Sequence, residues 1–180
     1  GADYPDPDNF MKLFTADMMR QGYRPSWSNL VVSPETARDM LAAFLKGARK
    51  ELAIYDAKIQ DPAMIKIIKE RAAKGVTVRV LGNLKGPDGE VAVRPMKSVR
   101  LHVRAIIRDG TRAFVGSQSL RKSELANRRE VGLLISNPTV TRKLMQIFES
   151  DWADAAAKDK RKFETKDSKS DDTKDAKEKL

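Results

Sequence analysis

Two β-forming runs separated by a helical pattern constrain the fold of this chain most. Residues 52–57 and 76–81 are rich in residues that favour strands. Between them, Asp61-Pro62 predicts the start of a helix and Gly75 its end. A strand, a helix and a strand at this spacing predict a parallel pair of strands joined by a right-handed crossover. The fold class is therefore α/β.

The remaining patterns extend this unit. Ser33-Pro34 is a cap followed by proline at the first helical position, which predicts a helix from there to about residue 49. Asn137-Pro138 similarly predicts a last helix that reaches Trp152. We expect a helix at 9–20, a linker at 22–28, a loop at 82–93, a hairpin formed by 99–108 and 111–115, and a strand at 128–135. An α/β/α sandwich with a mixed sheet accounts for all of these elements.

Composition divides the chain into three parts. Residues 30–154 form one domain, and residues 155–180 form a charged tail that we expect to be disordered or a frayed helix. The segment MKLFTADM at 11–18 echoes MQIFESDW at 145–152. Two amphipathic helices can match this well by accident. Otherwise residues 1–29 are the final helix of a preceding copy of the same unit plus a linker.

Charge indicates the kind of partner. With 35 basic and 25 acidic residues, the formal net charge is +10, which favours nucleic acid or anionic lipid headgroups. The basic residues near 97–129 are either a solvated face or a funnel for an anionic substrate. They are Lys97, Arg100, Arg104, Arg108, Arg112, Arg121, Lys122, Arg128 and Arg129.

Cysteine and histidine counts exclude several kinds of site. No cysteine is present, so the chain has no thiol nucleophile and no cysteine-based metal site. A single histidine excludes a multi-histidine zinc site, and no carboxylates cluster suitably for metal chelation. The absence of cysteine does not indicate which cellular compartment holds the protein.

The histidine lies in a spaced set of residues that suit phosphate. In the segment LHVRAIIRDGTRAFVGSQSL at 101–120, His102 and Arg104 are two apart on an expected strand and share one face. Asp109-Gly110 predicts the hairpin turn. Ser117 and Ser119 then offer hydroxyls and backbone N–H groups to an anion. Taken singly, each residue is more often a packed histidine, a turn aspartate or a loop serine, but their conjunction favours phosphate chemistry.

The spacing resembles the signature of the phospholipase D superfamily. That signature is His-x-Lys, four residues, Asp, six residues and Gly-Ser-x-Asn, and here the matching residues are His102, Arg104, Asp109, Gly116, Ser117 and Ser119. Arg replaces the family's Lys, and the last Ser replaces its Asn. The resemblance covers about residues 31–154, including the strand that begins near Glu130. It implies a fold of two such α/β/α halves, fused in one chain or contributed by two identical subunits.

The family's chemistry assigns roles to these residues. One histidine attacks phosphorus to give a phosphohistidine, a second protonates the leaving alcohol, and no metal or other cofactor is required. His102 is then nucleophile or general acid, Arg104, Ser117 and Ser119 bind phosphate, and Asp109 holds the turn. Glu130 orients His102, unless it is an exposed strand carboxylate paired with Arg128 or Arg129. Arginine keeps the charge of the family's lysine and can bind two oxygens at once.

Since one histidine cannot be both base and acid in one step, the chain supplies half of an active site. The resemblance implies a phosphodiester hydrolase or phosphatidyltransferase that acts on phospholipid or nucleic acid. The missing half is an upstream N-terminal half or a second copy of the chain. The alternatives are a homodimeric nuclease and a catalytically silent module that binds phosphate or an anionic membrane surface.

Overall fold

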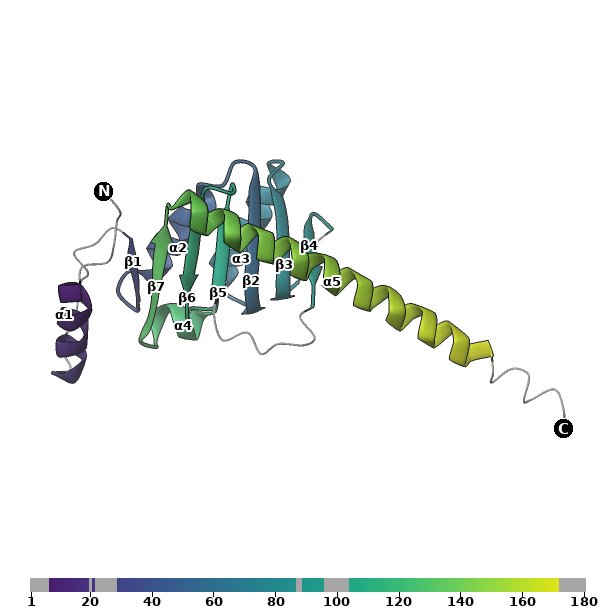
Figure 1. Cartoon of the computed structure of the whole chain (residues 1–180). Coiled ribbons are helices and arrows are strands. Elements are labelled where there is room, and N and C mark those ends of the chain that lie inside the picture. Colours follow the sequence, from purple (N-terminus) through teal and green to yellow (C-terminus); the bar gives the residue numbers. More distant parts are fainter. Residues whose placement is uncertain (1–6, 20, 22–28, 87–88, 96–103, 172–180) are drawn as a thin grey trace, which may run out of the picture.

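The chain folds around a seven-stranded mixed sheet in the order β1-β7-β6-β5-β2-β3-β4 (Figure 1). The computed structural model describes residues 7–19, 21, 29–86, 89–95 and 104–171. The strands are β1 (Leu30–Ser33), β2 (Glu51–Ile59), β3 (Thr77–Leu84), β4 (Val91–Arg94), β5 (Arg104–Arg108), β6 (Arg112–Gly116) and β7 (Glu130–Ile135). The helices are α1 (Pro7–Met18), α2 (Ala37–Lys46), α3 (Pro62–Ala73), α4 (Lys122–Ala126) and α5 (Pro138–Asp171).

The central crossover forms as the sequence predicts. Strands β2 and β3 pair in parallel, with Leu52 opposite Val78. The carboxylate of Asp61 caps α3 by accepting hydrogen bonds from the N–H groups of Ala63 at 3.1 Å and Met64 at 3.2 Å. Asp61 thus binds two of the N–H groups that have no partner within a helix's first turn.

Helices cover both faces of the sheet, which confirms the α/β/α sandwich. On one face α2 and α3 pack on the sheet, and the fully buried Ile106 of β5 lies in this core. On the other face α5 crosses the sheet (Figure 1), and Phe148 packs edge to face with Tyr55 at 5.1 Å between ring centroids. Ala105 and Ile107 point to this second core. Both faces of β5 are therefore buried, as expected for a central strand covered by helices on either side.

The hairpin that carries the motif also forms. Strands β5 and β6 pair antiparallel, with Arg108 opposite Arg112. The backbone φ angles of Asp109 and Gly110 are 53° and 66°. Residues 109–111 connect the paired Arg108 and Arg112, and the Thr111 N–H donates to the Arg108 carbonyl at 3.1 Å. Positive φ at both central residues of this turn is what a type I′ turn requires. The first residues of the expected strand, 99–103, lie outside the described residues.

Two expectations are wrong because sheet pairing overrides the local pattern. Ser33 does not cap a helix: it is the last residue of β1, fully buried and paired opposite Glu130, and α2 begins only at Ala37 after the N-cap residue Thr36. The expected loop at 82–93 is also partly strand. Strand β3 continues to Leu84, and β4 adds to it in parallel, with Val91 opposite Val78.

The two ends of the chain carry helices. The tail expected to be disordered or a frayed helix continues α5 as far as Asp171, and residues 172–180 lie outside the described part. At the other end, α1 packs Leu13 and Ala16 against the β1 residues Leu30 and Val32. Its opposite side leaves apolar side chains more than half exposed, namely Met11, Phe14, Met18 and Met19. None of the helices in the described ranges is both long and apolar enough to cross a membrane.

Candidate functional site

Three strands bring Arg104, Gly116 and Glu130 to one edge of the sheet. Arg104, the first residue of β5, lies opposite Gly116, the last residue of β6. Gly116 in turn lies opposite Gly132 of β7. Glu130 precedes Gly132 by two positions, so it points to the same face of the sheet as Arg104. Arg104 and Glu130, two of the predicted site residues, therefore share one edge and one face, separated by the glycine pair.

The glycine pair makes room for two side chains that lie on the sheet. A Cβ atom on Gly116 would lie 2.6 Å from Gln118 Oε1 and 2.7 Å from the Phe114 ring, and a Cβ on Gly132 would meet the same two side chains. Gln118 is almost fully buried, and its Nε2 donates to the carbonyl of Val31 at 3.1 Å. No partner within the described part of the chain binds its Oε1. The surface of the sheet between Arg104 and Glu130 is thus tightly packed by Phe114 and Gln118.

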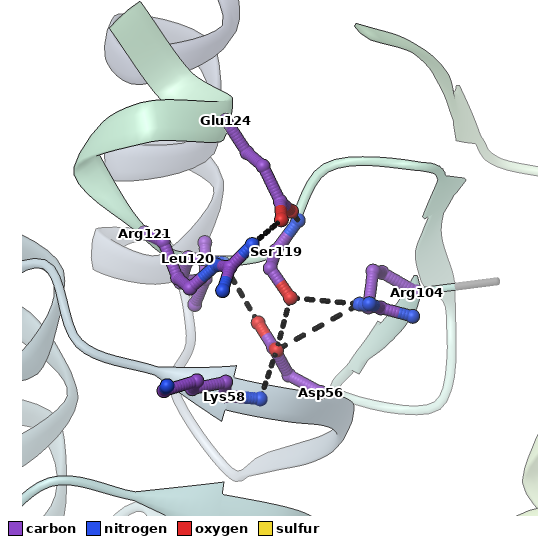
Figure 2. A network of polar contacts seen from close by, with 7 residues as sticks. All are labelled: Asp56, Lys58, Arg104, Ser119, Leu120, Arg121 and Glu124. Atoms are coloured by element: carbon purple, nitrogen blue, oxygen red, sulfur yellow. Dashed lines mark hydrogen bonds and ion pairs between the residues drawn. The ribbon is translucent and has the colours of Figure 1, made fainter. Parts of the chain in front are cut away.

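Arg104 is held on one side by a hydrogen-bonded pair (Figure 2). Its Nε donates to Ser119 Oγ at 2.7 Å, and the same Nε lies 3.9 Å from Asp56 Oδ1. The Arg104 side chain is 16% exposed. In Figure 2 one edge of the guanidinium group faces Ser119 and Asp56, while a terminal nitrogen points away from them. Ser119, which the motif predicts as a phosphate ligand together with Arg104, therefore lies beside it.

Asp56 is a buried carboxylate at the centre of this network. It accepts hydrogen bonds from Ser119 Oγ at 2.6 Å, from the Leu120 N–H at 2.7 Å and from the Lys58 N–H at 2.9 Å. Its side chain is 2% exposed. Burial raises the pKa of Asp56, and the three donors and the nearby Arg104 reduce that rise.

Ser119 links the other members of the network. Because a hydroxyl carries one proton, the bond to Asp56 commits that proton, and the Ser119 oxygen accepts from Arg104. The Ser119 N–H donates to Glu124 Oε2 at 2.5 Å, and Glu124 also pairs with Arg121. Ser119 is 1% exposed. It connects Asp56 to Arg104 rather than facing solvent.

Ser117 lies at the same edge and is exposed. Its N–H donates to the carbonyl of Val131 at 3.1 Å, and its Oγ accepts from the Val131 N–H at 3.2 Å. These contacts continue the β6–β7 pairing one residue beyond Gly116 and hold Ser117 near Glu130. His102 precedes β5 by two residues and lies outside the described residues.

Asp109 lies at the far end of β5 from Arg104. The two residues are five positions apart along the strand, which is about 16 Å at the usual rise. The Asp109 carboxylate accepts from the N–H groups of Arg49 at 3.1 Å, Lys50 at 2.7 Å and Glu51 at 3.0 Å. Burial acts to raise the pKa of Asp109, but these donors and Arg108 outweigh it, and the pKa is lowered. Asp109 fastens the hairpin turn to the start of β2 and does not join the other motif residues.

Several basic residues near the motif bind groups within the protein. This reduces the set that could attract an anionic substrate, and Lys97 and Arg100 lie outside the described residues. Arg108 donates to the Phe44 carbonyl at 3.0 Å, Arg121 pairs with Glu124, and Arg129 pairs with Asp17 at 2.7 Å and with Glu35 at 2.5 Å.

A lysine-lined hollow lies near the network. The hollow measures about 590 Å³ and is lined in part by Gln60, Lys66, Lys69, Glu70 and Lys85. The Gln60 N–H donates at 3.0 Å to the carbonyl of Leu120, whose own N–H binds Asp56. These lysines form no recognisable pattern in the sequence, because they come from two segments that only the fold brings together.

Three further residues of the network and its surroundings were not predicted from the sequence, namely Asp56, Gln118 and Glu124. Asp56 lies within β2 directly after the apolar run 52–55, and a carboxylate inside a buried strand is a usable signal. Gln118 and Glu124 give no comparable signal, since polar residues are ordinary in a loop and in a short helix. Within the described ranges, no three carboxylate or imidazole side chains gather closely enough to hold a metal ion.

A family model described as "Cardiolipin synthase, PLD-like domain" matches residues 41–152. The chain belongs to the phospholipase D-like domain family. This finding confirms the resemblance based on His102, Arg104 and the residues that follow them. Membership supports a phosphodiesterase-type function. No curated protein matches the sequence.

Solved structures agree with the phospholipase D-like fold. Nuc from Salmonella typhimurium, a phospholipase D family member, has a TM-score of 0.62 and 18% identity, covering 69% of this chain and 92% of Nuc. NucT from Helicobacter pylori has a TM-score of 0.60 and 18% identity, covering 69% of this chain and 94% of NucT. Polyphosphate kinase from Porphyromonas gingivalis has a TM-score of 0.67 and 19% identity, covering 78% of this chain but 24% of the kinase.

Proposed function

We propose that this phospholipase D-like domain cleaves or transfers phosphodiesters and supplies one half of the active site. The observation that carries the proposal is the cation of Arg104, held by Ser119 at the strand edge where the family motif begins. A fixed guanidinium group at that edge can bind the nonbridging oxygens of a phosphodiester through its terminal nitrogens. Ser117, which is exposed at the same edge, is the second phosphate ligand in this proposal.

His102 carries the covalent step. Its imidazole nitrogen attacks phosphorus, the bond from phosphorus to the leaving oxygen breaks, and a histidine of the other half gives its proton to that oxygen. The same second histidine then takes a proton from water or an alcohol, which displaces His102 and releases the phosphoryl group. His102 and its counterpart can also exchange these two roles. Glu130 orients His102 by accepting a hydrogen bond from its second nitrogen, since it lies on the face of the sheet that carries Arg104.

The burial pattern of α1 supports an origin in a duplicated protein. Residues 11–18 match residues 145–152 at an offset of 134 positions. In α5, Met145, Phe148 and Trp152 pack on the sheet, whereas their counterparts Met11, Phe14 and Met18 are exposed in α1. In the duplicated protein, α1 would be the last helix of the preceding half, and its exposed side would pack on that half's sheet as α5 does here. The preceding half would also provide the second histidine.

The lysine hollow favours the nuclease as the second candidate function. Lys66, Lys69 and Lys85 line one hollow together with Gln60, whose N–H binds the Leu120 carbonyl, and several phosphates of a nucleic acid can bind such a surface. The second histidine would then come from a second copy of the chain. DNA binding that weakens steeply with salt is expected for this candidate, and no binding at low salt would exclude it.

Hydrolysis of a chromogenic phosphodiester tests the leading proposal. The wild-type chain is compared with His102→Ala, which controls for a contaminating enzyme, and with Arg104→Ala. Activity that both substitutions abolish is expected if two copies of the chain complete one site. If the wild-type chain is inactive, the assay is repeated with a longer protein that includes the residues encoded upstream of this chain. Inactivity there, with phosphate binding intact, would contradict the enzyme and support the silent phosphate-binding module.

A further inference from the structure

We infer that Asp56 is a positioning residue that, through Ser119, sets the orientation of the Arg104 guanidinium group toward phosphate. The inference rests on the proposed function for its effect on catalysis, but the positioning can be measured without it. Asp56 belongs to β2 and Arg104 to β5, and these strands pair antiparallel with Tyr55 opposite Ala105. Asp56 follows Tyr55 and Arg104 precedes Ala105, so the two residues lie side by side on neighbouring strands.

The direction of the hydrogen bonds supports this role. The carboxylate accepts from the backbone N–H groups of Leu120 and Lys58, so the main chain fixes its position. It then takes the one proton of Ser119, which leaves the Ser119 oxygen as an acceptor for Arg104 Nε. Without the carboxylate, the hydroxyl could rotate and offer its proton toward Arg104 instead. We call this set of contacts the Asp56–Ser119–Arg104 relay: Asp56 fixes the proton of Ser119, and Ser119 then accepts from Arg104.

Positioning matters more for arginine than for lysine at this place. A lysine ammonium group is a point charge with three rotatable donors, whereas guanidinium is planar and binds two oxygens only in the right orientation. Ser119 and Asp56 engage one edge of the plane through Nε, so a terminal nitrogen points away from them (Figure 2). The charge on Asp56 also faces donors on several sides, which limits its repulsion of a bound phosphate. The relay thereby suits a site in which arginine replaces the family's lysine.

The first readout is the exchange of the Arg104 Nε proton with solvent, measured by NMR and assigned by its loss in Arg104→Lys. We expect slow exchange in the wild-type chain and exchange at least about tenfold faster in Asp56→Asn, because the relay is broken. Ser119→Ala breaks the relay at its middle and is expected to do the same, which keeps the test valid if Asp56→Asn does not fold. Unchanged exchange in the folded variants would overturn the inference.

The matched control is Asp61→Asn. Asp61 is likewise a buried aspartate that binds two backbone N–H groups and an arginine, Arg38 at 2.7 Å, but it does not bind Arg104. Asp61→Asn should lower stability and leave the Arg104 Nε exchange unchanged. If it accelerates that exchange as much as Asp56→Asn does, the effect is general loosening and the inference fails.

The second readout is the kinetics with a chromogenic phosphodiester. In Asp56→Asn we expect KM to rise about tenfold and kcat to change less than about threefold, because binding of phosphate is what the relay supports. In an Arg104→Ala background the same substitution should have no further effect on diester affinity. Tighter diester binding in Asp56→Asn would mean that the carboxylate competes with phosphate, and it would overturn the inference. Faster Nε exchange with no diester binding in any protein would instead reject the proposed function and leave the positioning intact.

Discussion

Asp109→Ala should destabilise the chain strongly although Asp109 lies far from Arg104. The substitution removes the acceptor for the N–H groups of Arg49, Lys50 and Glu51. A hydrogen bond to a charged group contributes about 1.5–3 kcal/mol when it is buried, and roughly half of that is appropriate at this partly exposed turn. Alanine at a φ of 53° adds about 1 kcal/mol of strain that aspartate tolerates better. The three hydrogen bonds and the strain together amount to a loss of about 3–5.5 kcal/mol, or about 6–22 °C in Tm.

Urea and thermal unfolding of four proteins measure this loss. Asp109→Gly removes the carboxylate without the strain and should be about 1 kcal/mol more stable than Asp109→Ala, provided that flexibility of the unfolded chain adds little. Asp154→Ala replaces an exposed aspartate of α5 and should change stability by less than about 0.5 kcal/mol. Asp109→Ala within 0.5 kcal/mol of the wild type would refute the role of Asp109 as the fastening of the turn.

The stabilisation by Asp109 should also depend on pH. Because its folded-state pKa is lowered, the stabilisation is present above the unfolded value of about 3.9 and is lost as the pH falls through the folded-state pKa. The stability difference between wild type and Asp109→Ala should therefore shrink as the pH is lowered from 6 toward 2. A difference that stays constant over this range would contradict the assignment of the stabilisation to the carboxylate.

Three further substitutions are tested by the urea midpoint. The first two test packing, each against a matched control, and the third tests a buried ion pair. Gly132→Ala should cost about 3 kcal/mol because its Cβ meets the Phe114 ring and Gln118, whereas Gly89→Ala, in open space, should be neutral. Phe148→Ala should cost about 3–5 kcal/mol because the ring is fully buried, and Ile147→Ala, which is 45% exposed, less than about 1 kcal/mol. Asp61→Asn keeps an oxygen that can cap α3 and should cost about 1 kcal/mol at neutral pH through the lost charge facing Arg38, and less as the pH falls through its lowered pKa.

Short sequence patterns were sufficient to predict the helices and turns whose formation depends on a few adjacent residues. The crossover, its capped helix α3 and the Asp109-Gly110 hairpin each depend on a few adjacent residues, and all three form as expected. The last helix also begins as expected, where Asn137 Oδ1 accepts from the N–H groups of Thr139 and Val140 at 2.9 and 3.2 Å.

Distant pairing could not be predicted in the same way. Strand β1 pairs with β7, about 100 residues away, and that pairing makes Ser33 a buried strand residue instead of a helix cap. Strand β4 exists because β3 offers it a parallel edge. The same reason explains the candidate site, since the contacts of Asp56 with Leu120 and Ser119 join residues 64 and 63 positions apart. The motif identified Arg104 and Ser119, while their shared partner required the fold.

The most direct test of the account is equilibrium binding of a phosphodiester to the chain, measured by titration calorimetry. It requires one half of the active site and no turnover. We expect saturable binding to the wild type and to His102→Ala, and a loss of at least about tenfold in affinity in Arg104→Ala, whose cation binds the phosphate. Binding that is equally strong without the Arg104 guanidinium group, or absent from the wild-type chain, would contradict the assignment of this strand edge as a phosphodiester site.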